Sequence, residues 1–201
     1  MIVSIDTSSA ISVTITDDDA TVALARASVF SPRGHAELLS DLVRQALAEA
    51  GATRADITAV VAGTGPAPFT GLRVGLVTAR TLALAWKVPA WGVCSLDAMG
   101  AEHGDVLAVA DARRREVYWA RYAGGLRVAG PDVGAPTSVL VRKGELVVGR
   151  GALLYADAFP GAIDADPDPL WLAKEAVRRL AAGEDLPTEP LYLRRPDVHG
   201  A

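Results

Sequence analysis

The segment Gly63–Arg73, with the sequence GTGPAPFTGLR, combines residue types that can bind an anion. It follows an apolar run over Ile57–Ala62 and leads into the apolar, helix-like segment Leu72–Trp86. A strand, a glycine-rich turn and a helix N-terminus together present backbone N–H groups and the positive end of the helix dipole to a phosphate. The segment therefore raises the question of whether this chain binds and transforms a phosphate compound.

Two prolines in this segment argue against phosphate binding. Pro66 and Pro68 carry no N–H group and cannot donate to an anion. Gly65, Thr70 and Gly71 can still turn the chain and cap the helix that follows. We therefore favour a rigid elbow between strand and helix over a phosphate cradle, and we keep the cradle open as the second interpretation.

The other reactive residue types do not form a cluster in the sequence. The three histidines, His35, His103 and His199, are scattered, and none has a partner at metal-ligand spacing. Cys94 is the single cysteine, so the chain can form neither an internal disulfide nor a cysteine metal cluster. No nucleophile-elbow pattern supports a Ser–His–Asp triad. The sequence thus predicts no catalytic residue and no metal ligand.

The composition is that of a folded protein without a strongly charged face. Half of the 201 residues are hydrophobic, 22% are charged and the formal net charge is −4. A protein that binds nucleic acid alone needs a concentrated basic face, and the only tight basic cluster is Arg113–Arg115, for which we expect a solvated turn. No signal-peptide pattern is visible, and Leu72–Trp86 is too short and too charged to span a bilayer. We expect a cytoplasmic protein without membrane contact.

Residue periodicity predicts an antiparallel opening followed by two helices. Met1–Ile5 has the character of a buried strand, Ile11–Ile15 has the two-residue period of a half-exposed strand, and Ala20–Val29 supplies a third strand. The pattern then predicts a helix, a strand and a second helix, at His35–Ala50, Ile57–Ala62 and Leu72–Trp86. The second helix is apolar on most sides, as expected of a helix that is deeply buried or covered by another chain.

The second half of the chain repeats this opening. Val106–Ala110 and Glu116–Tyr122 predict two strands joined by a turn, so that LAVAD before the turn echoes IVSID at the N-terminus. A short strand at Leu146–Val148 and a helix within Pro167–Ala182 follow. We therefore predict an α/β fold of two related lobes, residues 1–103 and the smaller 104–201, whose C-terminal part can pack back on the first lobe.

Two lobes that each open with a strand ending in aspartate are similar to the actin-like ATPase and sugar-kinase fold, which binds nucleotide between its lobes. In that fold the first aspartate helps to hold the metal, and nearby glycines let backbone N–H groups reach phosphate oxygens. Here Thr7–Ser9 and Ala112–Arg115 follow the two aspartates without a glycine, although Gly149–Ala152 keeps a partial adenosine-loop pattern. The similarity implies a vestigial nucleotide cleft with the residues Asp6, Gly65, Thr70, Gly71 and Asp111.

Six motifs resemble the TsaB family, also called YeaZ-like, in order and spacing. They are IDTSS at 5–9, GHAELL at 34–39, GTGPAPFTGLRVGL at 63–76, SLDAM at 95–99, DARRREVYWARY at 111–122 and PLYLR at 190–194. The most specific is Phe69–Arg73 followed by Gly75, although Ala67 and Pro68 replace residues of the family's usual Gly-Pro-Gly-Ser-Phe-Thr-Gly. The resemblance covers nearly the whole chain and is thinner between residues 123 and 187.

The resemblance implies a function without catalysis in this chain. TsaB proteins are non-catalytic relatives of TsaD, the subunit that transfers the threonylcarbamoyl group when N6-threonylcarbamoyladenosine is made beside the anticodon of tRNA. TsaD holds its metal with a His-x-x-x-His pair, and this chain has Ser95 and Met99 in those places, which are poor ligands for a divalent metal. We expect a scaffolding and activating subunit that binds TsaD, in a complex completed by the ATPase TsaE. ATP and metal are expected on these partners, with no cofactor here and tRNA contacted only through the complex.

The resemblance also implies that helices of the first lobe bind TsaD or, in its absence, a second copy of the chain. The partner-binding residues that we expect are Leu38, Leu42, Arg73, Leu76, Val77 and Arg80, and a place for the apolar ones in the chain's own core is an equal alternative. Two rival functions are an ATP-dependent metabolite kinase and a peptidase of the same fold. The kinase predicts glycines after Asp6 and Asp111, and the peptidase predicts a metal pair or an activated nucleophile.

Overall fold

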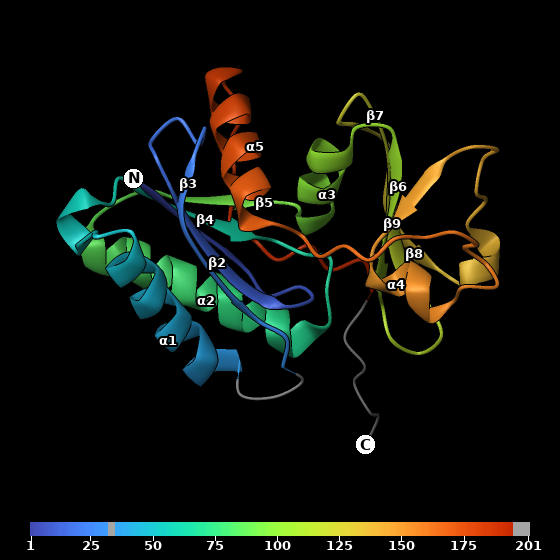
Figure 1. Ribbon diagram of the computed structural model, residues 1–201, viewed down its shortest axis with the longest axis horizontal. Coiled ribbons are helices and arrows are strands. Elements are labelled where there is room, and N and C mark those ends of the chain that lie inside the picture. The colour runs from blue at the N-terminus through green and yellow to red at the C-terminus, as the bar shows by residue number, and fades with distance from the viewer. Residues whose placement is uncertain (32–34, 195–201) are drawn as a thin grey trace.

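The computed structural model describes residues 1–31 and 35–194, which form two mixed β-sheets standing side by side (Figure 1). The first sheet contains β1 (Ile2–Asp6), β2 (Ile11–Thr16), β3 (Ala23–Val29), β4 (Ala59–Gly63) and β5 (Ala90–Val93). The second contains β6 (Val106–Asp111), β7 (Val117–Ala123), β8 (Leu126–Gly134) and β9 (Leu146–Val148). The helices are α1 (His35–Glu49), α2 (Phe69–Trp86), α3 (Ser95–His103), α4 (Arg150–Leu154) and α5 (Pro169–Ala181), with short 3-10 turns at Arg54–Asp56 and Pro136–Ser138. Gly34, from one of the family motifs, and His199 lie outside the described residues.

The two sheets share one topology. In the first, β1 pairs antiparallel with β2 and parallel with β4, and β2 pairs antiparallel with β3. In the second, β6 pairs antiparallel with β7 and parallel with β9, and β7 pairs antiparallel with β8. The predicted opening and its repeat are therefore confirmed. The strand β8 was not predicted, because Gly130, Pro131 and Gly134 interrupt its apolar pattern.

Helices cover both faces of the first sheet. α1 and α2 lie on one face, and α5 lies on the other (Figure 1). Because successive residues of a strand point to opposite faces, Val3 and Ile5 pack with the apolar residues of α1 and α2. Ile2 packs in a second cluster with Leu172 of α5. Every residue of β1 is buried as a result.

The prediction that β2 is half-exposed is wrong. Ile11, Val13 and Ile15 pack with α1 and α2, as the alternation indicates. On the other face Ser12 is 9% exposed and Thr14 is 2% exposed, because α5 lies over them. The period of two identified the strand correctly. It could not show that a helix from the far end of the chain covers the polar side.

The second sheet is also covered on both faces, and the two halves of the chain exchange helices. α3 packs on one face of this sheet and on α5, and the cluster around Phe159 and α4 packs on the other face. α3 belongs to residues 1–103 and α5 to residues 104–201, yet each contacts the sheet of the other half. We propose that the boundary at residue 103 separates the two sheets but not the helices that cover them. Each lobe then contains its own sheet together with a helix from the other half of the chain.

Local sequence signals set the start of α5 and the end of α2. Asp168 caps α5 by accepting a hydrogen bond from the Leu170 N–H (2.9 Å), with proline at the first helical position. α2 begins at Phe69, three residues before the predicted start, and ends at Trp86, followed by the C-cap Lys87 in the left-handed conformation (φ 60°). Among the helices of residues 1–31 and 35–194, none combines the length and the apolar character that crossing a bilayer requires.

Candidate functional site

A cleft of about 960 Å³ lies between the two lobes. The loop after β1, the start of α2, α3, the end of β6 and α4 all contribute to its walls. Thr70, Gly71 and Asp111, three of the five residues predicted for a nucleotide cleft, line it. The other two, Asp6 and Gly65, are not among the lining residues.

Asp6 is 2% exposed and does not line the cleft. Its Oδ1 accepts hydrogen bonds from the Ser8 N–H (2.8 Å) and the Ser8 hydroxyl (2.5 Å), and its Oδ2 accepts one from the Ser95 hydroxyl (2.6 Å). Gly63 of β4 leaves the space for this carboxylate, because a Cβ atom there would lie 1.9 Å from Asp6 Oδ2. Groups of the chain itself therefore enclose the carboxylate.

This environment disfavours the charged form of Asp6. Burial raises the pKa of the carboxyl from 3.8 to about 6, and the hydrogen bonds from Ser8 and Ser95 oppose the rise only in part. A metal that bridges to a nucleotide needs an ionised carboxylate with an oxygen facing the ligand. The residues around Asp6 therefore do not fit a site for such a metal ion.

The loop between β4 and α2 is tied to its neighbours by its own polar groups. The Gly65 N–H donates to the Ser95 hydroxyl (3.2 Å), and the Gly65 carbonyl accepts from the Ser95 N–H (2.7 Å). The Thr7 hydroxyl donates to the Gly71 carbonyl (2.8 Å) and fills the space that a Cβ at Gly75 would need. These contacts favour the elbow over the phosphate cradle.

Asp111 is engaged by the turn that follows it. It accepts a hydrogen bond from the Arg113 N–H (2.8 Å) and forms an ion pair with the Arg113 guanidinium (3.2 Å). The exposed arginines of the turn have φ values of 61°, 55° and 61°, from Arg113 to Arg115. This left-handed conformation costs roughly 1–2 kcal/mol for each residue that is not glycine. The expected solvated turn is present.

Ser95 and Met99, which we expected from the resemblance to replace the metal-ligand pair of TsaD, have structural contacts. Both are 1% exposed. Ser95 bridges Asp6 and Gly65, as described above, and Met99 packs with Tyr118 and other apolar residues between α3 and the second sheet. Within residues 1–31 and 35–194, no group of three or more His, Cys, Asp or Glu side chains could hold a metal ion.

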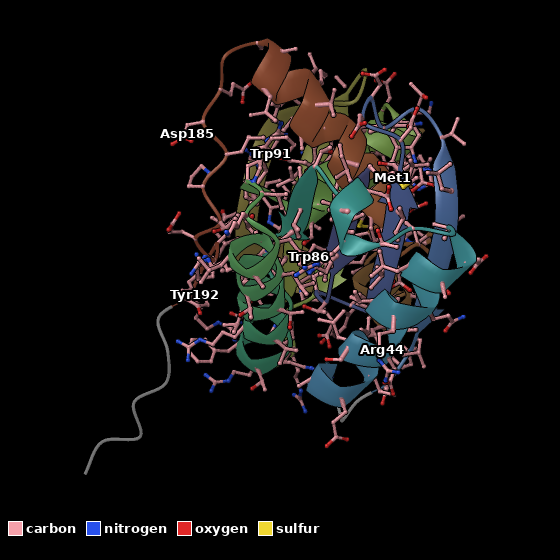
Figure 2. All side chains as sticks on the ribbon, turned by 90° about the vertical axis from the view of Figure 1, so that its left-hand side faces the viewer. Met1, Arg44, Trp86, Trp91, Asp185 and Tyr192 are labelled. Carbon is pink, nitrogen blue, oxygen red and sulfur yellow. The ribbon has the colours of Figure 1, made fainter. Side chains whose placement is uncertain are left out.

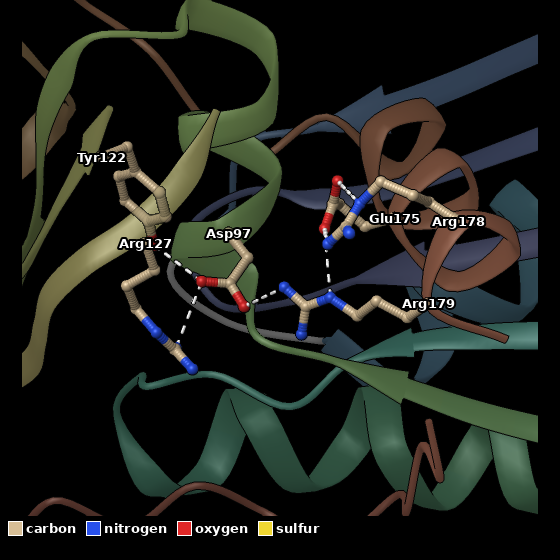
Figure 3. Close-up of polar contacts among 6 residues, drawn as sticks. All are labelled: Asp97, Tyr122, Arg127, Glu175, Arg178 and Arg179. Atoms are coloured by element: carbon tan, nitrogen blue, oxygen red, sulfur yellow. Dashed lines mark hydrogen bonds and ion pairs between the residues drawn. The ribbon is translucent and has the colours of Figure 1, made fainter. Parts of the chain in front are cut away.

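A buried polar network joins the two lobes (Figure 3). Asp97 of α3, which is 1% exposed, accepts hydrogen bonds from the Tyr122 hydroxyl (2.8 Å) and from Arg179 of α5 (2.6 Å). Arg127 of β8 lies 3.2 Å from the same carboxylate. Glu175 extends the network by an ion pair with Arg179 (3.1 Å). One carboxylate thus connects α3, the second sheet and the helix that covers the first sheet.

The residues predicted to bind a partner divide into buried and exposed ones. Leu42 and Leu76 are 8% and 3% exposed, and they pack in the core of the first lobe together with the half-buried Leu38. Val77 is 59% exposed, and Leu84, one heptad further along the same face of α2, is 82% exposed. A partner can therefore reach Val77 and Leu84 directly, and it can reach Leu42 and Leu76 only if the core opens.

The two predicted arginines of α2 are exposed but held by the chain itself. Arg73 donates to the Tyr192 hydroxyl (2.9 Å), and Arg80 donates to the Thr188 hydroxyl (2.8 Å). In Figure 2 the chain from Asp185 to Tyr192 descends beside α2.

Sequence reasoning missed Asp97, Leu84 and Tyr192 as residues of interest. Residues seven apart lie on the same face of a helix, so the position of Val77 would have indicated Leu84. Tyr192 lies in the PLYLR motif, which pointed to a family and carried no indication of its contact with α2. The network of Asp97 could not be found, because its arginines come from β8 and α5, far along the chain.

Sequence comparison relates this chain to enzymes and accessory proteins of tRNA modification. Residues 29–149 match the family model of TsaD, described as tRNA N6-adenosine threonylcarbamoyltransferase. The uncharacterized protein Rv3421c of Mycobacterium tuberculosis is 46% identical over 178 residues, which are 88% of this chain and 83% of the relative. The tRNA threonylcarbamoyladenosine biosynthesis protein TsaB of Escherichia coli is 41% identical over 97 residues, which are 45% of this chain and 42% of the relative.

Comparison with solved structures finds proteins of the YeaZ type. A Pseudomonas aeruginosa protein described as similar to the peptidase YeaZ superimposes with a TM-score of 0.79 at 28% identity, over 96% of this chain and 99% of that one. YeaZ from the same organism gives a TM-score of 0.77 at 26% identity, again over 96% and 99% of the two chains. The expected fold, that of the actin-like ATPases and sugar kinases with two mixed sheets, is confirmed.

Proposed function

Because the chain belongs to the TsaD family and is TsaB/YeaZ-like within it, we propose that it serves in the biosynthesis of N6-threonylcarbamoyladenosine in tRNA. Its role in this proposal is that of a scaffolding and activating subunit without catalysis of its own. It binds TsaD, it joins TsaE in the complex, and it pairs with a second copy when TsaD is absent.

The observation that carries this proposal is the exposed apolar face of α2. The buried residues of this helix, Leu72, Gly75, Leu76, Ala79 and Ala83, form one stripe towards the first sheet. Val77 and Leu84 lie outside that stripe and face solvent. An exposed apolar stripe on a helix that is otherwise packed is a feature of surfaces that bind another protein. A specific interface would bury about 800 Å² on each partner.

The state of the two aspartates supports a role without catalysis. Asp6 is buried among Ser8, Ser95 and Gly63, and Asp111 is paired with Arg113. A kinase of this fold would need both carboxylates near a metal and a phosphate. A peptidase, the activity named in the description of one structural neighbour, would need an activated nucleophile or a metal-bound water. In the cleft as described, neither constellation is present.

The proposal predicts that a charge at the centre of the exposed face abolishes pairing. In Val77→Asp an ionised carboxylate would have to be desolvated in the interface, which is costly when it has no partner. We expect the variant to fold normally, because Val77 is 59% exposed, and to bind purified TsaD of the same organism at least 100-fold more weakly by isothermal titration calorimetry.

Val128→Asp is the matched control. Val128 is the same residue type on β8 of the second lobe, and it is 56% exposed. We expect this variant to bind TsaD with the affinity of the unchanged chain. If Val77→Asp keeps its melting temperature and binds TsaD as tightly as Val128→Asp does, α2 is not the contact surface.

A further inference from the structure

Residues 186–194, here named the C-terminal strap, run along the outside of the first lobe beside α2 (Figure 2). The strap has no regular secondary structure, and backbone hydrogen bonds hold it in place. The Gly92 N–H of β5 donates to the Leu186 carbonyl (2.9 Å), and the Leu191 N–H donates to the Thr64 carbonyl (2.8 Å). A Cβ atom at Gly92 would lie 2.2 Å from the Pro187 carbonyl oxygen, so glycine is required for this close approach.

One end of the strap holds Arg73 at the start of α2. The ring of Tyr192 stacks on the ring of Phe69, with 5.1 Å between centroids and 27° between planes. The Arg73 guanidinium lies 3.3 Å above the Phe69 ring and donates to the Tyr192 hydroxyl (2.9 Å). Stacking and the hydrogen bond together fix the direction of this arginine.

The other end holds Arg80, two turns further along α2. Arg80 donates to the hydroxyl of Thr188 (2.8 Å) and to its carbonyl, and its guanidinium lies 3.6 Å from the Glu189 carboxylate. A guanidinium has five N–H donors. Among the contacts of the described residues, the strap uses one donor of Arg73 and two hydrogen bonds from Arg80. Donors on both arginines remain available to acidic groups of a partner.

The strap and the exposed face of α2 form one continuous surface. Arg73, Val77, Arg80 and Leu84 recur at spacings of three and four residues, which places them along one side of the helix. The apolar positions are 59% and 82% exposed, at Val77 and Leu84. On the strap, Tyr192 is 38% exposed and the side chain of Glu189 is 75% exposed. A chain that packs on α2 along this side meets both elements.

We propose that the partner surface is a composite of α2 and the C-terminal strap. α2 supplies the apolar contacts of Val77 and Leu84. The strap supplies Tyr192 and Glu189 and orients Arg73 and Arg80 beside them. The occupant is a TsaD chain, so this inference rests on the proposed function, and the free donors of the arginines predict carboxylates at the edge of TsaD's contact surface.

The strap is already held in place in the free chain. This favours a strap that stays in place and contacts the partner over a strap that the partner displaces. Leu186 is 6% exposed and packs with α5 on the first sheet, and Leu191 and Leu193 pack with the second lobe. Arg194 forms an ion pair with Glu116 and donates to the Ala112 carbonyl (3.4 Å). Displacement would break contacts at both ends, whereas docking on the strap uses arginines whose side-chain entropy is already reduced.

The test measures the affinity of the full chain for purified TsaD in three variants. Tyr192→Ala removes the stack and the acceptor of Arg73, and we expect binding to weaken at least 10-fold. Glu189→Ala removes the ion pair with Arg80, and we expect a loss of about 3-fold. Glu184→Ala is the control, because Glu184 is an exposed residue that precedes the strap, and its affinity should stay within 2-fold of the unchanged chain.

Hydrogen exchange of the unchanged chain provides a measurement that does not depend on how the variants fold. On addition of TsaD we expect the amides of residues 188–193 to exchange at least 5-fold more slowly. Faster exchange there, or equal or tighter binding by a folded Tyr192→Ala, would overturn the composite surface. Failure of the unchanged chain to bind TsaD at all would overturn the proposed function itself, and the strap assignment with it.

Discussion

At the scale of the residue, Asp6 shows how a carboxylate at the end of a buried strand loses contact with the cleft. Two serines supply the polar partners that a metal or a phosphate-bound water would otherwise supply, and Gly63 provides the space. The result is a carboxyl group whose pKa rises to about 6 because of burial. Its protonation state is therefore coupled to folding.

This coupling predicts a pH dependence of stability with a definite sign. The pKa of Asp6 is 3.8 in the unfolded chain and about 6 in the folded chain, so the folded state binds the proton more tightly. The stabilising contribution is full below pH 3.8 and is lost as pH rises through 6. Between low and high pH the contribution of Asp6 to the free energy of unfolding changes by about 3 kcal/mol. In Asp6→Asn this contribution should vanish.

Urea unfolding between pH 3.5 and 7.5 checks the prediction. The difference in free energy of unfolding between the unchanged chain and Asp6→Asn should change by about 3 kcal/mol across this range. The unchanged chain should lose stability relative to the variant as pH rises. A difference that is constant over the range would show that Asp6 is not shifted by burial.

At the scale of the element, α3 holds the structure together through Asp97. The helix lies between the second sheet and α5, and the network of Asp97 is its polar contact with both (Figure 3). Removing one partner of a buried ion pair leaves the other charge uncompensated, which costs about 3–5 kcal/mol. In Asp97→Asn, Arg127 loses the charged acceptor but is 34% exposed. Arg179 keeps its ion pair with Glu175, so we expect an effect at the lower end of this range.

We therefore expect Asp97→Asn to lower the free energy of unfolding by about 3 kcal/mol in urea titrations. Asp41→Asn is a control in which an ion pair with Arg44 is also lost, but both side chains are largely exposed, at 64% and 78%, and such surface pairs contribute at most about 1 kcal/mol. Equal effects of the two substitutions would contradict a structural role for the buried network.

The elements also show how far the sequence determines this fold. Apolar runs identified β1 and β6, alternation identified β2, and the repeat of the opening identified β7, because these signals are local in sequence. Alternation failed for the exposure of β2, which depends on α5. No local pattern indicated that Arg73 and Arg80 contact the strap. Contacts between distant segments leave little trace in local periodicity, and the site of a binding protein consists largely of such contacts.

At the scale of the whole molecule, the fold keeps the two lobes and the cleft of an actin-like protein while its polar groups bind one another. The lobes exchange helices, a buried network connects them, and the C-terminal strap runs from one to the other. These ties favour a rigid body over a cleft that opens and closes around a ligand. On the outer side of α2, apolar residues are exposed next to two arginines that the strap orients.

The most direct measurement is size-exclusion chromatography with light scattering on this chain mixed with TsaD of the same organism. We predict a stable complex with the mass of at least one copy of each chain, and a homodimer of this chain when TsaD is left out. Separate elution of the two chains at micromolar concentrations, with TsaD shown to be folded, would contradict the role of a TsaD-binding subunit.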